Sequence, residues 1–257
     1  MPGPIRIAMW SGPRNLSTAM MRSWGNRPDT AVCDEPLYAH YLRETGIDHP
    51  GAAEVIAHHE PDWRKVVAGL VGAVPDGKAI FYQKHMAHHL LPEVGRDWFG
   101  QVTHAFLIRD PREMLTSLVK VLPEPTLADT GLPQQREVFD WVTARTGRVP
   151  PVVDAREVLE DPAEVLGLLC GRLGVAFDPA MLQWPAGRRP TDGIWARYWY
   201  EAVERSTTFA PFRPKDEPLP ARLGGLLDRC LEIYEALHRH RIIPRTRREA
   251  TDAPGVR

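Results

Sequence analysis

One short stretch near the start of the chain constrains its fold more than any other. Residues 5–10 form an apolar run, residues 11–18 are polar and contain glycine and proline, and residues 19–25 have a helix-like pattern. This order predicts a strand, a loop and a helix, the unit from which parallel α/β sheets are built. A helix N-terminus has unpaired N–H groups and partial positive charge, so the loop before it predicts an anion site, to which Arg14 and two hydroxyls contribute. We expect a phosphate-rich ligand there.

The loop is similar to two kinds of phosphate-binding loop, but not equally. Counted from Gly12, the positions of the second glycine and the lysine in the nucleotide-triphosphatase P-loop hold Ser17 and Thr18, so the usual Lys and Mg²⁺ contacts to a γ-phosphate are missing. The loop resembles instead the 5′-phosphosulfate loop of sulfotransferases that use 3′-phosphoadenylyl sulfate (PAPS). That loop has a proline, a basic residue, two variable residues and then two hydroxyl residues. This resemblance implies that the donor is bound by Gly12, Pro13, Arg14, Asn15, Leu16, Ser17 and Thr18.

A second strand-to-helix segment carries the other half of the expected donor site. Residues 101–108 have the pattern of a buried strand. Asp110 is a good N-cap for the helix that follows, a proline suits its first position, and Glu113 stands where a capping box needs it. Arg109 ends the strand, and Ser117 lies two turns into the helix. This pair, eight residues apart, resembles the 3′-phosphate-binding segment of the same family, which implies that Arg109 and Ser117 hold the 3′-phosphate of PAPS.

Two further segments support the resemblance. Residues 80–86 predict a strand that ends in polar residues, and His85 lies five residues before Leu90. The cytosolic sulfotransferases have a catalytic histidine at this place, so the resemblance assigns that role to His85. Residues 152–162 resemble a later strand, acidic turn and helix of the family, with the helix expected to run on to residue 173. This match is weaker, because the frequent aromatic and acidic pair is replaced, and no adenine contact is assigned there. The resemblance is to sulfotransferases of the bacterial small-molecule type and extends from residue 5 to about residue 177.

Strand-like runs alternate with helical patterns along the chain. This alternation predicts a parallel sheet covered by helices on both faces, and we expect a three-layer α/β/α fold with a P-loop-like nucleotide-binding sheet. Ligands bind at the carboxyl ends of the strands in such sheets. No linker divides the chain, so we expect one domain over residues 1–243, followed by a mobile tail at residues 244–257. The five strand-like runs are residues 5–10, 31–34, 79–84, 101–108 and 152–154.

Charge and cysteine content argue against several other classes of protein. The formal net charge is −1, so no global field attracts the chain to nucleic acid or lipid. The longest apolar run, residues 66–74, is too short to span a bilayer, and the first residues do not resemble a leader sequence. Three scattered cysteines indicate reduced thiols rather than a disulfide framework. We expect a cytoplasmic protein with no nucleic-acid partner and no membrane span, and its oligomeric state stays open.

The resemblance implies transfer of a sulfuryl group from PAPS to a hydroxyl or amine of a small-molecule acceptor. Positioning and electrostatic stabilisation do most of the work of such a transfer, and it needs no metal. Arg14 would stabilise charge on the bridging and sulfonate oxygens, and Asn15 would bond the sulfonate. Two residues compete as general base. We expect His85 to titrate near neutral pH, with a pKa of roughly 6 to 7, as imidazole does. Glu35 follows residues 31–34, where some bacterial sulfotransferases have a catalytic carboxylate. We place His85 slightly ahead.

Other interpretations of the same residues stay open. The two arginines could pair with nearby carboxylates, and the two hydroxyls could only cap the first helix. His85, His88 and His89 have a spacing that could present a zinc face on a helix. The chain could be a P-loop-type kinase of a small metabolite, or a nucleotide-binding protein that keeps the fold without the chemistry. An aromatic group could line the acceptor pocket or pack as a helix stripe: Trp195, Tyr198, Trp199, Tyr200 and Phe209.

Overall fold

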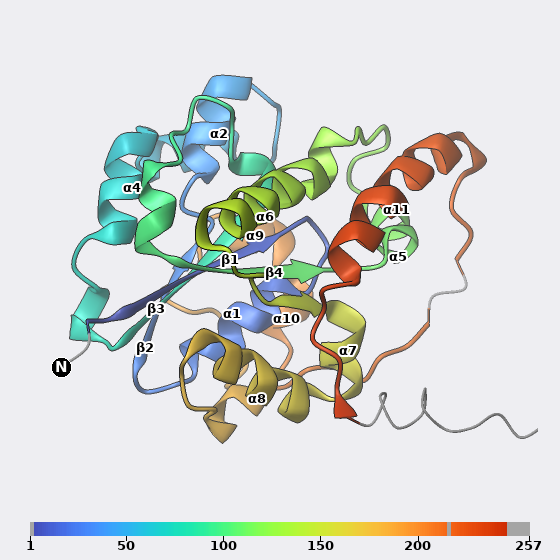
Figure 1. The fold of residues 1–257 in the computed structure, drawn as a ribbon. Coiled ribbons are helices and arrows are strands. Elements are labelled where there is room, and N and C mark those ends of the chain that lie inside the picture. The colour runs from blue at the N-terminus through green and yellow to red at the C-terminus, as the bar shows by residue number, and fades with distance from the viewer. Residues whose placement is uncertain (1–2, 215–216, 246–257) are drawn as a thin grey trace, which may run out of the picture.

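The computed structural model describes residues 3–214 and 217–245. At its centre is a five-stranded sheet in which all neighbouring strands are parallel, in the order β2-β3-β1-β4-β5. Helices cover both faces of this sheet (Figure 1), which confirms the predicted three-layer α/β class. The strands are β1 Ile5–Ser11, β2 Thr30–Asp34, β3 Ile80–Met86, β4 Thr103–Ile108 and β5 Val152–Asp154.

The helices form two layers with separate apolar cores. They are α1 Ser17–Gly25, α2 Tyr38–Thr45, α3 Ala52–His58, α4 Trp63–Val71, α5 Pro111–Leu118, α6 Leu132–Thr146, α7 Ala155–Glu160, α8 Pro162–Leu173, α9 Ala196–Trp199, α10 Glu201–Glu204 and α11 Gly224–His238. Short 3₁₀ turns are η1 Pro75–Gly77, η2 Ala87–His89, η3 Asp97–Gln101, η4 Ala128–Thr130, η5 Pro179–Leu182 and η6 Ala221–Leu223. One face of the sheet packs on α1, α7 and α8, and the other on α4, α6 and α11 (Figure 1).

Alternation of side chains along the central strands decides which residues can meet. On β1, Ile7 and Met9 enter the core on the α1 and α8 side, whereas Ala8 and Trp10 enter the core on the α4 and α6 side. Burial of apolar surface at roughly 25 cal/mol per Å² drives the formation of both cores. Because successive side chains of a strand point to opposite faces, neighbouring residues Lys84 and His85 of β3 lie on opposite sides of the sheet.

Some element boundaries differ from the sequence prediction. β3 ends at Met86, as the pattern of residues 80–86 predicts, with His85 as its penultimate residue, whereas β4 begins at Thr103, two residues after the predicted start. The helix predicted to run to residue 173 is interrupted at Asp161, which ends α7 and caps the first turn of α8. The proline that follows Asp161 suits the first position of a new helix and cannot continue the old one. Residues 246–257 of the expected tail lie outside the described residues.

Two observations concern the expected compartment and the membrane. Cys33, Cys170 and Cys230 are free thiols. Across residues 3–214 and 217–245, no helix combines the length and the apolar character needed to cross a bilayer.

Candidate active site

The loop between β1 and α1 has an uncommon backbone. Arg14 and Leu16 have positive φ angles of 60° and 68°, which cost a non-glycine residue about 1–3 kcal/mol each and tend to occur at functional sites. Gly12 is required because a Cβ there would lie 2.4 Å from the carbonyl oxygen of Thr130. The N-cap residue of α1, Leu16, makes no side-chain capping bond. The first turn of α1 is therefore suited to an anion.

Arg14 and Arg109 bring the two expected donor-binding segments together. Nε of Arg14 donates to Oγ of Ser117 at 2.9 Å. Nη1 of Arg109 donates to the backbone carbonyl of Arg14, also at 2.9 Å. These contacts join the loop after β1 to the end of β4 and to α5, which lie 95 and 103 residues further along the chain. The structure thus gathers Arg14, Arg109 and Ser117 into one cluster at the carboxyl edge of the sheet.

Positive charge exceeds negative charge in this cluster. Nε and Nη2 of Arg109 donate to Glu113 at 3.0 and 2.8 Å, so the acid expected in a capping box binds the arginine instead. Within the described residues Arg14 has no carboxylate partner. Surrounding protein atoms lower the pKa of Arg14, and the charge of Arg109 lowers it further, although a guanidinium keeps its proton. Two guanidiniums beside one carboxylate make the loop a favourable place for an anion.

Two other loop residues attach the loop to the sheet. Nδ2 of Asn15 donates to the carbonyl of Leu107 on β4 at 3.4 Å, and the Ser17 hydroxyl contacts Sδ of Met86 on β3 at 4.0 Å. The amide group that was expected to bond the sulfonate is therefore directed toward β4. Oδ1 of Asn15 is buried with no hydrogen-bond partner among the described residues, and an amide oxygen cannot donate to an anion. The half-buried residues of the loop are Pro13, Leu16 and Thr18.

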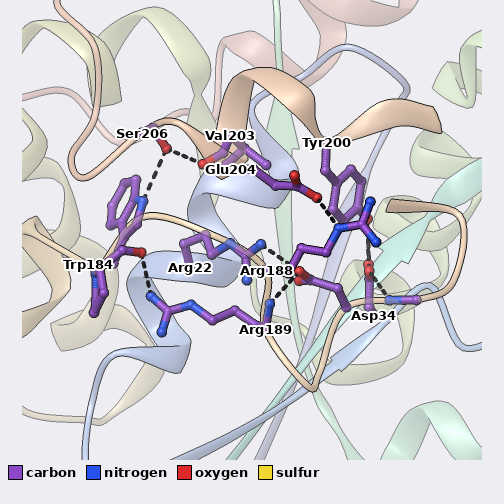
Figure 2. A network of polar contacts seen from close by, with 12 residues as sticks. Arg22, Asp34, Trp184, Arg188, Arg189, Tyr200, Val203, Glu204 and Ser206 are labelled. Carbon is purple, nitrogen blue, oxygen red and sulfur yellow. Dashed lines mark hydrogen bonds and ion pairs between the residues drawn. The ribbon is translucent and has the colours of Figure 1, made fainter. Parts of the chain in front are cut away.

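A second polar cluster lies where β2 and β3 end. Nζ of Lys84 donates to Asp34 at 2.8 Å, to Glu35 at 2.5 Å and to the Tyr200 hydroxyl at 2.6 Å. The Tyr200 hydroxyl lies 2.8 and 2.9 Å from the two carboxylate oxygens of Asp34. Figure 2 shows Tyr200 meeting Asp34 from a segment far along the chain. Glu35 has a φ of 44°, a third strained backbone position next to the sheet edge.

The surroundings of Glu35 make it a better proton acceptor near neutral pH. Burial raises its pKa; Lys84 opposes this rise and Asp34 adds to it, and the net shift is upward. Its side chain is still 12% exposed. For Lys84, burial opposes the charged form, but Asp34 and Glu35 outweigh it and hold its pKa well above the usual range. The cluster therefore contains a permanent ammonium beside a carboxylate suited to general-base catalysis.

His85 lies in the core on the other side of the sheet. Its ring stacks on Trp10 at a centroid distance of 4.4 Å, and the residue is 1% exposed. Burial lowers the pKa of His85 to about 3, with a smaller contribution from His104. The expectation that this imidazole titrates near neutral pH is therefore wrong, because β3 carries the ring into an apolar layer even though His85 is the penultimate residue of the strand.

Histidines 88 and 89 belong to η2, a single 3₁₀ turn, and not to the face of an α-helix. The His89 ring stacks on Tyr38 and Tyr41, at centroid distances of 4.6 and 4.8 Å. Its Nδ1 lies 4.0 Å from the Glu35 carboxylate, and burial lowers the pKa of His88 to about 4. In the part of the chain that the structure describes, no group of three or more His, Cys, Asp or Glu residues could hold a metal ion.

Lys84 is a residue of the candidate site that was not recognised from the sequence, and Tyr200 was recognised only as one member of an aromatic group. One feature of the sequence could have indicated Lys84. It is a lysine inside an otherwise buried strand, and it lies next to two acidic residues at the end of the neighbouring strand. The members of the aromatic group that contains Tyr200 do not all lie together in the structure. Trp195 packs edge-on against Tyr38 at 5.0 Å, near the cluster, whereas Phe209 packs on Trp184.

The buried position of His85 predicts a change in acid stability. Because its folded pKa lies below the ordinary value, the unfolded chain binds one more proton between about pH 6.5 and pH 3, so stability falls as the pH decreases through this window. His85→Phe keeps a ring against Trp10 and should make the free energy of unfolding less steep by about 1.4 kcal/mol per pH unit. Urea unfolding at several pH values measures this slope, with His58→Phe on the exposed end of α3 as the control. An unchanged slope in His85→Phe would contradict the buried placement.

The fold and the site together define a class of protein. A parallel sheet with strand-to-helix loops at its carboxyl edge, two converging guanidiniums and an uncapped helix start is typical of proteins that bind phosphate-bearing ligands. Residues 5–241 match the family described as the sulfotransferase domain, so the chain belongs to the sulfotransferase domain family.

Two curated relatives come from Arabidopsis thaliana and are named branched-chain-amino-acid aminotransferase-like proteins 1 and 2. They are 37% and 35% identical to this chain over 240 and 234 residues, which is 93% and 91% of this chain. The chain spans only 43% and 41% of the length of these relatives.

Solved structures of sulfotransferase domains share the fold. The domain from the Synechococcus PCC 7002 olefin synthase has a TM-score of 0.57 at 19% identity, covering 91% of this chain and 95% of that one. The sulfotransferase from Alicyclobacillus acidocaldarius has a TM-score of 0.53 at 14% identity, covering 94% and 98%. The domain from the curacin biosynthetic pathway has a TM-score of 0.54 at 14% identity, covering 95% and 100%.

Proposed function

We propose that this chain transfers a sulfuryl group from PAPS to a hydroxyl or amine of a small-molecule acceptor. The observation that carries the proposal is the cluster of Arg14, Arg109 and Ser117, in which guanidiniums from two strand ends lie beside a single carboxylate. Charge-assisted donors at two neighbouring strand ends suit a nucleotide with phosphates on two sides of its ribose. We place the reaction in the cytoplasm, in keeping with the free cysteines, and it involves no nucleic acid.

In the proposed reaction the acceptor atom attacks sulfur in line with the bridging S–O bond of the donor. A bond from the acceptor atom to sulfur forms, and the S–O bond breaks with its electron pair passing to the 5′-phosphate of adenosine 3′,5′-bisphosphate (PAP). The first turn of α1 with Ser17 and Thr18 holds that 5′-phosphate, and Arg109 with Ser117 holds the 3′-phosphate. Arg14 stabilises the charge that develops on the bridging oxygen.

Glu35 takes the acceptor proton in this scheme. It is partly exposed at the sheet edge and its raised pKa suits proton transfer near neutral pH. His85 is less suitable, because a base must come within hydrogen-bond reach of the acceptor and this ring is enclosed by Trp10 and Trp98. We therefore propose Glu35 as the base and reverse the order of preference that the sequence favoured.

Nucleotide protection and transfer assays test the proposal. A ligand that binds only the folded chain stabilises it by about 2.7 kcal/mol at 100 times its Kd, so PAP should raise Tm more than adenylyl sulfate or ATP with Mg²⁺. Radiolabelled PAPS should then pass its label to members of a panel of small alcohols, phenols and amines. Protection by ATP with phosphate transfer would favour a small-metabolite kinase. PAP binding without turnover of any acceptor would favour a nucleotide-binding protein.

Arg109→Ala should remove selectivity for the 3′-phosphate. Loss of a charge-assisted contact to phosphate costs about 2–3 kcal/mol, so PAP affinity should fall roughly 30- to 140-fold, while adenosine 5′-phosphate affinity hardly changes. Isothermal calorimetry with both nucleotides measures this difference. Arg136→Ala is the matched control, because Arg136 also forms an ion pair four residues along its helix, with Asp140 at 2.6 Å. Equal losses for both nucleotides would remove Arg109 from the 3′-phosphate site.

A further inference from the structure

Lys84 is fully enclosed in a hydrogen-bonded cluster. It is 1% exposed, and its ammonium has three N–H groups and three acceptors: Asp34, Glu35 and the Tyr200 hydroxyl. Tyr200 is equally saturated, because it donates to Asp34 and accepts from Lys84 and from Nε1 of Trp195 at 3.2 Å. Lys84 therefore has no donor left for a substrate and can affect the reaction only through the groups it contacts. Of the two carboxylates among these, Glu35 is 12% exposed and Asp34 only 1%.

Charge balance in the cluster depends on this single cation. Two adjacent carboxylates, Asp34 and Glu35, share one ammonium at 2.8 and 2.5 Å. Removing a partner from a buried ion pair leaves an uncompensated charge, which takes up a proton when it can. Of the two acids, Glu35 has the weaker network of other donors, because Asp34 also accepts from Tyr200 and from the backbone N–H of Gly193 at 3.1 Å.

The groups that face Glu35 come from several elements. Asp34 at the end of β2 and Lys84 on β3 are the closest charges. His89 of η2 lies 4.0 Å away, and its pKa is well below the usual value because it is buried and lies near other histidines. Tyr38 of α2 is neutral, since burial raises its pKa, and Tyr200 is 3.3 Å from Glu35. Among the described residues, Lys84 is thus the permanent cation that contacts Glu35.

Residues 187–204 form a segment, here called the strap, that contacts the cluster. Asp192 pairs with the buried Arg22 of α1 at 2.7 Å, and the next residue, Gly193, donates its N–H to Asp34. Figure 2 shows Arg22, Asp34 and Tyr200 within this network, together with arginines of the strap. Glu35 is therefore fixed from the sheet by Lys84 and from the strap by Tyr200.

We propose that Lys84 is a positioning residue of the sulfuryl transfer: it holds the Glu35 carboxylate ionised and oriented toward the acceptor, with Tyr200 linking the pair to the strap. This role rests on the proposed function and on Glu35 as the base. It predicts that loss of the cation alters the titration of Glu35 and not the binding of the donor.

Lys84→Met tests the role through the protonation of Glu35. Without the cation the ionised carboxylate is less favourable, so its titration and the acid limb of kcat/KM should both move upward by about one pH unit or more, and Lys84→Arg should restore them. Carboxyl-labelled glutamate followed by ¹³C NMR measures the titration, with the Glu35 signal identified by its loss in Glu35→Gln. Lys120→Met is the control, because Lys120 pairs with Glu217 on the surface. Identical Glu35 titrations in wild type and Lys84→Met would overturn the proposal.

A second variant covers the case in which Lys84→Met does not fold. Tyr200→Phe removes one hydroxyl from the cluster and should also raise the pKa of Glu35, by less. Tyr234→Phe is the matched control, because it removes another buried hydrogen bond from a tyrosine to an aspartate, Asp154, at 2.7 Å. An unshifted Glu35 in folded Tyr200→Phe would overturn the proposal, as would loss of PAP protection in Lys84→Met. NMR titration needs no turnover, so a wild-type chain that transfers no sulfate would contradict the proposed function alone.

Discussion

Replacing Glu35 by glutamine is expected to lower kcat/KM by about 10²- to 10⁴-fold, the range for loss of a general base. The amide keeps the size of the side chain but cannot accept the acceptor proton. In wild type the rate should fall as the pH drops through the pKa of Glu35, which burial raises above its ordinary value, and this acid limb should vanish in Glu35→Gln. Initial rates against pH measure both effects, and PAP affinity should stay close to that of wild type.

Two comparison variants make the assignment of the base decisive. Glu137→Gln removes an exposed carboxylate that pairs with Arg96, and its pH profile should match that of wild type. His85→Phe should keep the acid limb, because the pKa of His85 is about 3 and its ring is buried. If the limb instead survives in Glu35→Gln and disappears in His85→Phe, His85 is the base.

Replacing Arg14 by alanine should lower kcat by about 10²- to 10³-fold while PAP binding weakens much less. Removal of one preorganised donor that faces developing charge has an effect of this size. Arg14 is free for such a role, because within the described residues its side chain donates one hydrogen bond, to Ser117, and has no carboxylate partner. Single-turnover rates and calorimetry with PAP separate the transition-state effect from ground-state binding.

Backbone strain at Arg14 has to be separated from the loss of its charge. Because φ at this position is 60°, alanine retains the strain, whereas glycine adopts this conformation freely. Arg14→Gly should therefore lose as much rate as Arg14→Ala while unfolding at a higher temperature. Arg14→Lys should recover part of the rate, since it restores a positive charge without the planar fork. A large loss of PAP affinity that parallels the loss of kcat in Arg14→Gly would assign Arg14 to donor binding instead.

Local patterns predicted the fold and the cluster of Arg14, Arg109 and Ser117, because each half of the cluster lies on a strand-to-helix turn that can be recognised from residues close together in the chain. The loop with Arg14 and the strand end with Arg109 are both strand-to-helix turns, and parallel strands bring such turns to one edge. The role of Glu113 could not be read in this way. Glu113 lies three residues after the N-cap Asp110, which fits a capping box, and four residues after Arg109, which fits an ion pair. The structure forms the ion pair with Arg109.

The second cluster was harder to predict, because β3 is buried on both faces. A central parallel strand has no polar and apolar alternation to show which side each residue faces, so Lys84 and His85 looked alike as polar residues at a strand end. Their opposite directions follow only from the register of β3 between β1 and β2. Tyr200 comes from a region where the family resemblance had already faded.

The dependence of the Glu35 cluster on Tyr200 also sets an order of events while the chain is being made. Tyr200 emerges 116 residues after Lys84 and 166 residues after Asp34, which at about 5–20 residues per second is a delay on the order of ten seconds. The hydrogen bonds that join Arg14, Arg109 and Ser117 involve no residue beyond α5. A growing chain can thus contain all members of the Arg14 cluster while the cluster around Glu35 still lacks one, so the two clusters at the carboxyl edge of the sheet can form at different times.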